Sequence, residues 1–251
     1  MIRAISFDFG NTLFPFGSRE WTRVLTRVHA AACRQLGAVS VGDFSHAYYV
    51  IREEQTRRNL PQLVENSLEE RLSLLLTRLW GPAAATWTDQ LVAEHAAAVV
   101  DSLECPHYLP GFLGDVAADY RLAVISNFPY APPIRAALER FGLAQHFQAI
   151  VVSAAVGRPK PHPLPFNVAL AALGVDAAEA VHVGDDRQAD LGGAAGVGMA
   201  AVLTDQWADP DDVPMVSGEP VPLPSLVPDG LTVQPLATIH RLTDLPAVLP
   251  R

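Results

Sequence analysis

The chain has 251 residues and a formal net charge of −9, with 49% hydrophobic and 18% charged residues. This length allows one large domain or two smaller ones, and the apolar content is ample for a buried core rather than a disordered chain. The negative charge argues against nucleic acid and against an anionic membrane surface as partners, because both attract basic patches.

The N-terminal part of the chain predicts one strand followed by helices. Residues 2–7 form an apolar run that ends at Asp8. After a short linker, apolar residues recur at helical spacing, and glycines and prolines interrupt the pattern. The expected helices cover about 19–36, 43–59, 66–80 and 88–103. We therefore predict an all-helical insertion after the first strand.

Beyond residue 105 the predicted elements alternate between strand and helix. We expect helices at about 110–119, 133–141, 163–173 and 188–195, and strands at 122–125, 149–153, 180–183, 199–203 and near 231–233. Alternation of this kind predicts right-handed crossovers and a doubly wound parallel sheet with helices on both faces. The predicted fold class is α/β: a Rossmann-like core from residues 1–16 and 105–251, with an all-helical cap domain at 17–104. A proline-rich stretch at about 208–228 predicts an extended surface loop.

Polar residues stand where several predicted strands end. Asp8 follows the first strand, Ser126 and Asn127 follow the second, and Asp185 follows the strand at 180–183. In an open parallel sheet the ligand crevice lies beyond the carboxyl ends of the strands. These side chains are therefore expected to meet at one edge, together with Lys160 from a loop.

The chemistry of these residues suits phosphate. A carboxylate such as Asp8 can attack phosphorus or bind Mg²⁺, which prefers hard oxygen ligands. Thr12 can hydrogen-bond within its loop or to Asp8. The Ser126 hydroxyl and the Asn127 backbone N–H can hold phosphoryl oxygens. Lys160 lies between two prolines that fix its backbone, and it can neutralise both the nucleophile and the transferring phosphoryl group.

Three aspartates cluster after the strand at 180–183. Asp185, which follows Gly184 in the sequence, is expected to provide the second carboxylate ligand of a metal ion. Asp190 can order the site through Lys160 or through a metal-bound water. Asp186 has two possible roles, as a metal ligand or as the N-cap of the following helix.

Taken together, these segments resemble the haloacid dehalogenase superfamily of aspartate-nucleophile hydrolases. The resemblance covers about the first 16 residues and 105–205, with a helical cap inserted after the first motif. It implies that Asp8 is the nucleophile and that Asp8 and Asp185 bind Mg²⁺. It also implies that Ser126 and Lys160 hold the phosphoryl group of a small phosphorylated substrate.

One position departs from the family pattern. Phosphatases of this family read Asp-x-Asp-Gly-Thr, whereas this chain has Gly10 in place of the second Asp. That Asp protonates the leaving group and activates water, a contribution of roughly 10²–10⁴-fold. The Gly10 carbonyl can still reach the metal. Leaving groups that need no proton, as in aryl phosphates, acyl phosphates or carbon–halogen bonds, suffer less from the loss.

Other side chains could supply the missing acid, although packing or surface roles are the simpler interpretation for each. Five of them lie on the predicted helix at 43–59 and one follows Lys160: His46, Tyr48, Tyr49, Arg52, Glu53 and His162. The aromatic pairs Phe14/Phe16 and Tyr48/Tyr49 could likewise line a pocket or simply pack in the core.

Three functional interpretations remain open because of Gly10. The favoured one is a Mg²⁺-dependent phosphatase. A metal-independent 2-haloacid dehalogenase also lacks the second Asp, but such enzymes do not resemble Gly-Asp-Asp at the fourth motif. The third is a weakly active or non-catalytic phosphate-binding module.

Phosphonate hydrolysis by a cap lysine is disfavoured, because residues 19–103 contain no lysine. No apolar run approaches the roughly 20 residues of a membrane span. The two cysteines match neither a disulfide framework nor a zinc motif. We expect a cytoplasmic protein that is a monomer or a homodimer.

Overall fold

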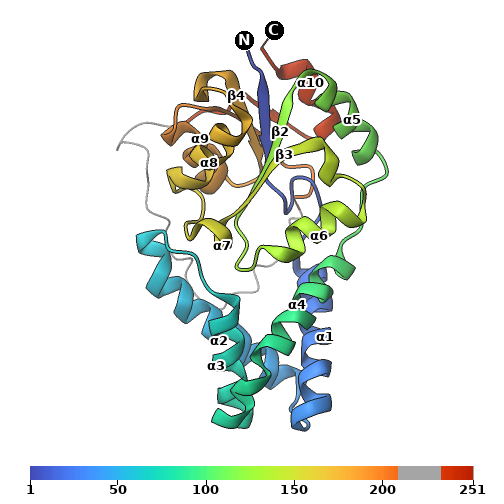
Figure 1. The fold of residues 1–251 in the computed structure, drawn as a ribbon, viewed down its shortest axis with the longest axis vertical. Coiled ribbons are helices and arrows are strands. Elements are labelled where there is room, and N and C mark those ends of the chain that lie inside the picture. The colour runs from blue at the N-terminus through green and yellow to red at the C-terminus, as the bar shows by residue number, and fades with distance from the viewer. Residues whose placement is uncertain (209–232, 251) are drawn as a thin grey trace.

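The computed structural model describes residues 1–208 and 233–250, and within them six parallel strands form one sheet. The strand order is β3-β2-β1-β4-β5-β6, so the chain starts in the middle and winds outward in both directions (Figure 1). This order confirms the predicted doubly wound α/β fold. The strands are β1 (Ala4–Phe7), β2 (Arg121–Ser126), β3 (Phe147–Val152), β4 (Ala180–Gly184), β5 (Ala200–Thr204) and β6 (Ala237–Ile239).

Helices cover both faces of the sheet and also extend away from it. The first four lie together below the sheet in Figure 1, and the others surround the sheet. The helices are α1 (Ser18–Leu36), α2 (Val41–Asn59), α3 (Leu68–Trp80), α4 (Thr88–Ser102), α5 (Leu109–Asp119), α6 (Pro132–Arg140), α7 (Ser153–Val156), α8 (Pro163–Leu173), α9 (Gly193–Gly196) and α10 (Leu245–Val248).

The central strands are apolar on both faces because each face is covered by helices. On β1, Ile5 and Phe7 point to one face and pack with apolar residues of α5, α6 and α10. Ala4 points to the other face and packs in a second cluster with α8 and α9. Burial on both sides explains why the strands are continuous apolar runs rather than alternating ones.

Helices α1–α4 pack mainly on one another, α1 against α4 and α2 against α3. Serine caps begin two of them: the Ser40 side chain accepts a hydrogen bond from the Asp43 N–H, and the Ser67 side chain accepts one from the Glu70 N–H. The buried faces of these helices are lined by apolar residues such as Leu72 and Val99. The predicted positions of these four helices agree with the structure to within about two residues at each end. The helix predicted at 188–195 is instead a π-helix at Arg187–Gly192 followed by α9.

Two sequence predictions concern the C-terminal part of the chain. The strand predicted near 231–233 falls mostly outside the described residues, and the last described strand is β6 at Ala237–Ile239, beside β5, which was not predicted. Backbone pairing with β5 defines the position of β6. A strand of only three residues has almost no alternation of apolar and polar residues by which the sequence could predict it. The predicted surface loop at 208–228 lies almost entirely outside the described residues.

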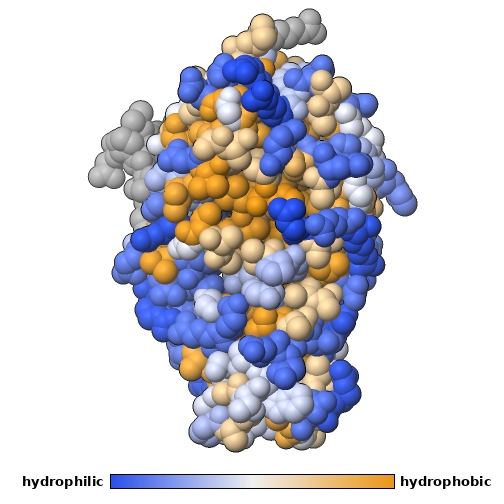
Figure 2. Space-filling model, in the orientation of Figure 1, coloured by the Kyte–Doolittle hydropathy of each residue, from blue (hydrophilic) through white to orange (hydrophobic). Residues whose placement is uncertain are grey.

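The surface differs between the two ends of the molecule. Figure 2 shows an apolar area at the level of the sheet, on the face where β3 and α8 lie, and a more polar surface towards helices α1–α4. Leu164 and Val168 of α8 are among the exposed large apolar residues. Across the described ranges, no helix has the length and apolar character needed to cross a membrane.

Candidate active site

A cavity of about 410 Å³ lies at the carboxyl edge of the sheet. Asp8 directly follows β1, Ser126 ends β2 and Asp185 directly follows β4. Because these strands are adjacent and parallel, their polar ends converge on the same edge. Residues of α1, α2 and α4 complete the cavity wall. Its size is typical of a pocket for a small molecule.

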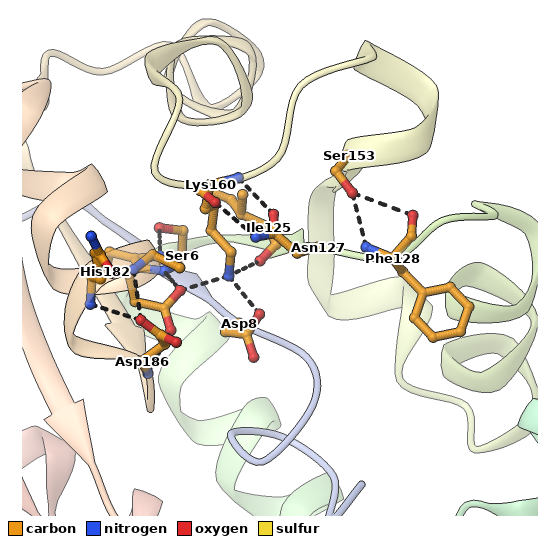
Figure 3. A network of polar contacts seen from close by, with 12 residues as sticks. Ser6, Asp8, Ile125, Asn127, Phe128, Ser153, Lys160, His182 and Asp186 are labelled. Carbon is orange, nitrogen blue, oxygen red and sulfur yellow. Dashed lines mark hydrogen bonds and ion pairs between the residues drawn. The ribbon is translucent and has the colours of Figure 1, made fainter. Parts of the chain in front are cut away.

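Lys160 is the centre of the polar network in this cavity, and it is the single lysine of the chain. Its Nζ lies 2.5 Å from Asp8 Oδ1 and 2.6 Å from Asp190 Oδ1, and it also donates to the Ile125 carbonyl oxygen at 2.8 Å. Figure 3 shows the ammonium pointing towards Asp8. With only 2% of its surface exposed, Lys160 has its charge balanced by these two carboxylates.

Asn127 fixes the backbone of Lys160. Its side-chain Oδ1 accepts from the Lys160 N–H at 2.6 Å, and its Nδ2 donates to the Lys160 carbonyl oxygen at 2.9 Å (Figure 3). An amide side chain suits this task because it offers a donor and an acceptor side by side. The sequence predicted a role for the Asn127 backbone but did not reveal this clamp.

Asp190 also lines the cavity and is held by hydrogen bonds from several sides. Oδ1 accepts from Lys160 and, at 2.9 Å, from His182 Nε2, while Oδ2 accepts from the Asp186 N–H at 3.0 Å. His182 in turn contacts the Ser6 hydroxyl through Nδ1 at 2.8 Å. His182 and Ser6 are fully buried, and sequence reasoning missed both because each lies inside an apolar strand.

Gly184 makes room for Asp190. A Cβ at residue 184 would lie 2.2 Å from Asp190 Cγ, far inside van der Waals contact. Only glycine therefore lets the β4 backbone pass this close to the carboxyl group.

The charges of the site shift its pKa values in opposite directions. Burial raises the pKa of Asp8 to about 6, although Lys160 opposes the shift. Partial desolvation in the cavity, and then the negative charges of Asp8 and Asp190, raise the pKa of Asp185 to about 8. Burial disfavours the charged forms of both Lys160 and Asp190. Their mutual attraction is stronger, so the pKa of Lys160 is raised above its usual value and the pKa of Asp190 is lowered below its usual value. The site thus holds more negative charge than Lys160 neutralises.

The acidic side chains fit a divalent cation. Asp8, Asp185 and Asp190 each offer a carboxylate oxygen, and the three oxygens lie within 4.8 Å of one another. Both oxygens of Asp190 already accept hydrogen bonds. Asp8 and Asp185 are therefore the side chains best suited to Mg²⁺, which prefers carboxylate oxygens and water. Gly10, whose carbonyl was predicted to reach the metal, also lines the cavity.

A family model described as "haloacid dehalogenase-like hydrolase" matches residues 2–198. The chain belongs to this hydrolase family. This haloacid dehalogenase-like chain is 39% identical over 110 residues to "Haloacid dehalogenase-like hydrolase domain-containing protein 3" of Bos taurus, a match that covers 42% of each protein. The chain therefore spans less than half the length of that relative.

Two further comparisons cover most of the haloacid dehalogenase-like chain. A "Glyceraldehyde 3-phosphate phosphatase" from Methanopyrus kandleri is 28% identical over 206 residues, which is 80% of this chain and 83% of the relative. The crystal structure of a 2-haloacid dehalogenase from Pseudomonas syringae pv. Tomato has a TM-score of 0.72 at 23% identity, over 99% of this chain and 98% of that one. The likeness to the solved structure supports the fold alone.

Two predicted site residues of the haloacid dehalogenase-like chain have local roles in the structure. Thr12 is fully buried, and its hydroxyl has no hydrogen-bond partner within residues 1–208 and 233–250, so the predicted bond to Asp8 is absent there. The loop directs Thr12 into the protein rather than into the cavity. Asp186 acts as an N-cap, accepting from the backbone N–H groups of Gln188 and Ala189 at 2.7 Å.

The remaining cavity wall is aromatic and carries one further cation. Phe16, Trp21 and Phe128 line it together with Arg52, whereas Phe14 and Tyr48 are buried in the core. Among the described lining residues there is no His, Tyr or Glu. Of the six candidate replacement acids, only Arg52 faces the cavity, and a guanidinium cannot serve as an acid at neutral pH.

Proposed function

We propose that this hydrolase is a Mg²⁺-dependent phosphatase that acts on a small phosphorylated substrate through an aspartyl-phosphate at Asp8. The observation that carries the proposal is the position of the Asp8 carboxylate, 2.5 Å from the Lys160 ammonium, in a cavity that it shares with Asp185. A nucleophile, a fixed cation and a second carboxylate at one sheet edge are what phosphoryl transfer requires.

In the first step an oxygen of Asp8 attacks phosphorus and the bond from phosphorus to the leaving-group oxygen breaks. Lys160 binds Asp8 Oδ1, which leaves Oδ2 as the attacking atom. The Lys160 ammonium, the Ser126 hydroxyl and the Asn127 backbone N–H offset the charge of the phosphoryl oxygens. Donors that are already fixed in place are effective because they need no reorganisation during the reaction.

In the second step water attacks the phosphorus of the aspartyl-phosphate, and Asp8 leaves as a carboxylate. Both protons of the water leave with the product: one stays on the released hydrogen phosphate, and the other stays on it as dihydrogen phosphate or passes to solvent. Asp8 and Asp185 would hold Mg²⁺, which supplies positive charge to the phosphoryl oxygens when bound. The excess negative charge around Asp8 and the raised pKa of Asp185 support this assignment.

The substrate range follows from Gly10. Gly10 supplies no acid where the family pattern has its second Asp, so the proposed substrates are those whose leaving group departs as a stable anion, such as aryl or acyl phosphates. We also propose that helices α1–α4 form the cap, residues 17–104, over a core of 1–16 and 105–251. Trp21, Arg52 and Val99 then select the substrate from the cap side.

Phosphate release from 4-nitrophenyl phosphate, with and without Mg²⁺, tests the proposal. Asp8→Asn should abolish turnover, and wild-type protein quenched in acid should carry the mass of one phosphoryl group on the peptide that contains Asp8. Asp115→Asn, an exposed carboxylate on α5, is the matched control and should retain full activity. Equal rates for wild type and Asp8→Asn would refute the nucleophile assignment.

Gly10 also favours a second candidate, a phosphate-binding module with little turnover. Mg²⁺-dependent binding of phosphate without turnover of any aryl or acyl phosphate would support it. The dehalogenase interpretation predicts halide release from a 2-haloacid without added metal. The acidic cluster of Asp8 and Asp185 argues against it, because an attacking carboxylate gains nothing from a second negative charge beside it.

A further inference from the structure

Arg52 is the one cation that helices α1–α4 contribute to the described wall of the cavity. Its guanidinium carbon lies 5.8 Å from the centre of the Trp21 ring, a cation–π distance. In the parts of the chain that the structure describes, no carboxylate forms an ion pair with it. Arg52 therefore brings to the cavity wall a positive charge that none of the described carboxylates pairs with directly.

Neighbouring arginines on the same helix are different. Arg57 forms an ion pair with Glu53, and Arg58 forms one with Glu70 at 2.8 Å. Both are well exposed, whereas Arg52 is partly buried. The arginines that face solvent thus have acidic partners, and the one that faces the cavity does not.

A second cation, Arg71, is close enough to act on the charge of Arg52. Arg71 is 3% exposed, and its guanidinium donates to Gln55 Oε1 at 2.9 Å and to the Tyr48 hydroxyl at 3.2 Å. Both acceptors are neutral, although the charge of Arg71 also attracts the carboxylates of Glu65 and Glu70 and lowers the pKa that each would otherwise have. Burial lowers the pKa of Arg52, and the charge of Arg71 acts in the same direction. A partly desolvated arginine in such a place is costly unless an anion joins it.

The shape of the cavity restricts where that anion belongs. Asp8, Asp185 and Lys160 come from the sheet edge, whereas Arg52 comes from α2 and lies among aromatic rings. The rings of Trp21 and Phe128 are nearly parallel, with an interplanar angle of 11°, and Phe16 contacts both edge-on. Aromatic walls of this kind favour a flat, apolar group. The anion beside Arg52 therefore belongs to the part of a ligand that is remote from the sheet edge.

We propose that Arg52 binds a second anionic group, a carboxylate or a phosphate, on the leaving group of the substrate, and that Phe16, Trp21 and Phe128 contact its flat body. The inference rests on the proposed phosphatase function, and it narrows the substrate class to phosphorylated acids or bisphosphates. A leaving group of this kind also suits Gly10, because an aryl or acyl oxygen departs without a proton from the protein.

A matched pair of substrates tests the inference. 4-Carboxyphenyl phosphate and 4-carbamoylphenyl phosphate differ in one charge, and the carbamoyl compound has the better leaving group. We expect the wild-type kcat/KM to favour the carboxylate by roughly tenfold or more, because a charge-assisted hydrogen bond to arginine is lost with the amide. Arg52→Gln should bring this ratio close to one, whereas Arg57→Gln, on the same helix, should leave it as in the wild type.

A second pair identifies the anion. 1,4-Phenylene bisphosphate compared with 4-hydroxyphenyl phosphate gives the corresponding ratio for a remote phosphate. The larger of the two wild-type ratios of kcat/KM, carboxylate over amide or phosphate over hydroxyl, indicates which anionic group Arg52 binds. If neither ratio exceeds one, or if Arg52→Gln lowers kcat/KM for charged and neutral substrates by the same factor, the inference is overturned. The second result would assign Arg52 to the transferred phosphoryl group.

Binding without turnover separates this inference from the proposed function. Calorimetric titration with 4-hydroxybenzoate and with 4-hydroxybenzamide needs no catalysis. Arg52-dependent preference for the benzoate, in a protein that releases phosphate from no substrate, would sustain the anion subsite and refute the phosphatase. Turnover of both aryl phosphates, with 4-hydroxybenzoate and 4-hydroxybenzamide bound equally, would support the phosphatase and refute the anion subsite.

Discussion

Replacing Gly10 by aspartate tests whether this residue alone limits the range of leaving groups. A Cβ at residue 10 would lie 3.6 Å from Phe16 Cβ, an ordinary van der Waals contact, and Gly10 has no left-handed backbone angle that a side chain would strain. The backbone at residue 10 therefore tolerates a side chain, and Gly10 lines the same cavity as Asp8. A general acid is worth roughly 10²–10⁴-fold, or about 3–5 kcal/mol of transition-state stabilisation.

The assay compares an alkyl phosphate, glycerol 2-phosphate, with 4-nitrophenyl phosphate. We expect Gly10→Asp to raise kcat/KM for the alkyl ester by about 10²-fold or more, since an alkoxide needs the proton, and to change the aryl ester by less than about tenfold. Gly10→Asn is the control, because it has the same size but no acidic proton. Equal effects of aspartate and asparagine, or equal gains on both esters, would refute the reasoning.

Three further predictions concern the support of the site. Gly184→Ala should cost about 1–3 kcal/mol of stability and lower kcat/KM, because its Cβ collides with Asp190; an unchanged melting temperature with full activity would contradict the geometry. His95 is buried and its pKa is lowered to about 3, so its contribution to stability is complete above pH 6.5 and falls as the pH drops towards 3. By pH 5 the loss of stability is about 2 kcal/mol. Urea unfolding of wild type and His95→Gln at pH 7.5 and pH 5 measures it, and the free energy of unfolding should change less with pH in the variant. Adding Mg²⁺ at about 100 times its Kd should stabilise the protein by about 2.7 kcal/mol in thermal unfolding, and Asp185→Asn should remove most of this gain; equal shifts in both proteins would place the ion elsewhere.

Much of the fold could be predicted because its signals are local. Strand runs such as 2–7 and the helical spacing at 19–36 persist over many residues, and glycines and prolines mark their ends. The final strand could not be located, because Ala237–Ile239 is defined only by its pairing with β5. Its position depends on long-range contacts that no short window of sequence contains.

In the candidate site, too, some residues could be predicted from local sequence and others could not. Asp8, Ser126 and Asp185 were predictable because each follows an apolar strand, and strand ends converge by topology. His182 and Ser6 were not, because polar residues within strands give no sign that they lie side by side on neighbouring strands. Thr12 was misjudged because the loop turns its hydroxyl inward. The Asn127 clamp depends on the path of a loop more than thirty residues away in sequence.

The single lysine of this chain has a practical consequence. Protein produced with isotope-labelled lysine yields one side-chain ammonium resonance, and that resonance comes from the centre of the candidate active site. Its chemical shift reports directly on the carboxylates around it, with no assignment problem and no background from the surface. Titrations with metal ions, phosphate mimics or substrates can therefore be followed at a single atom of the intact enzyme.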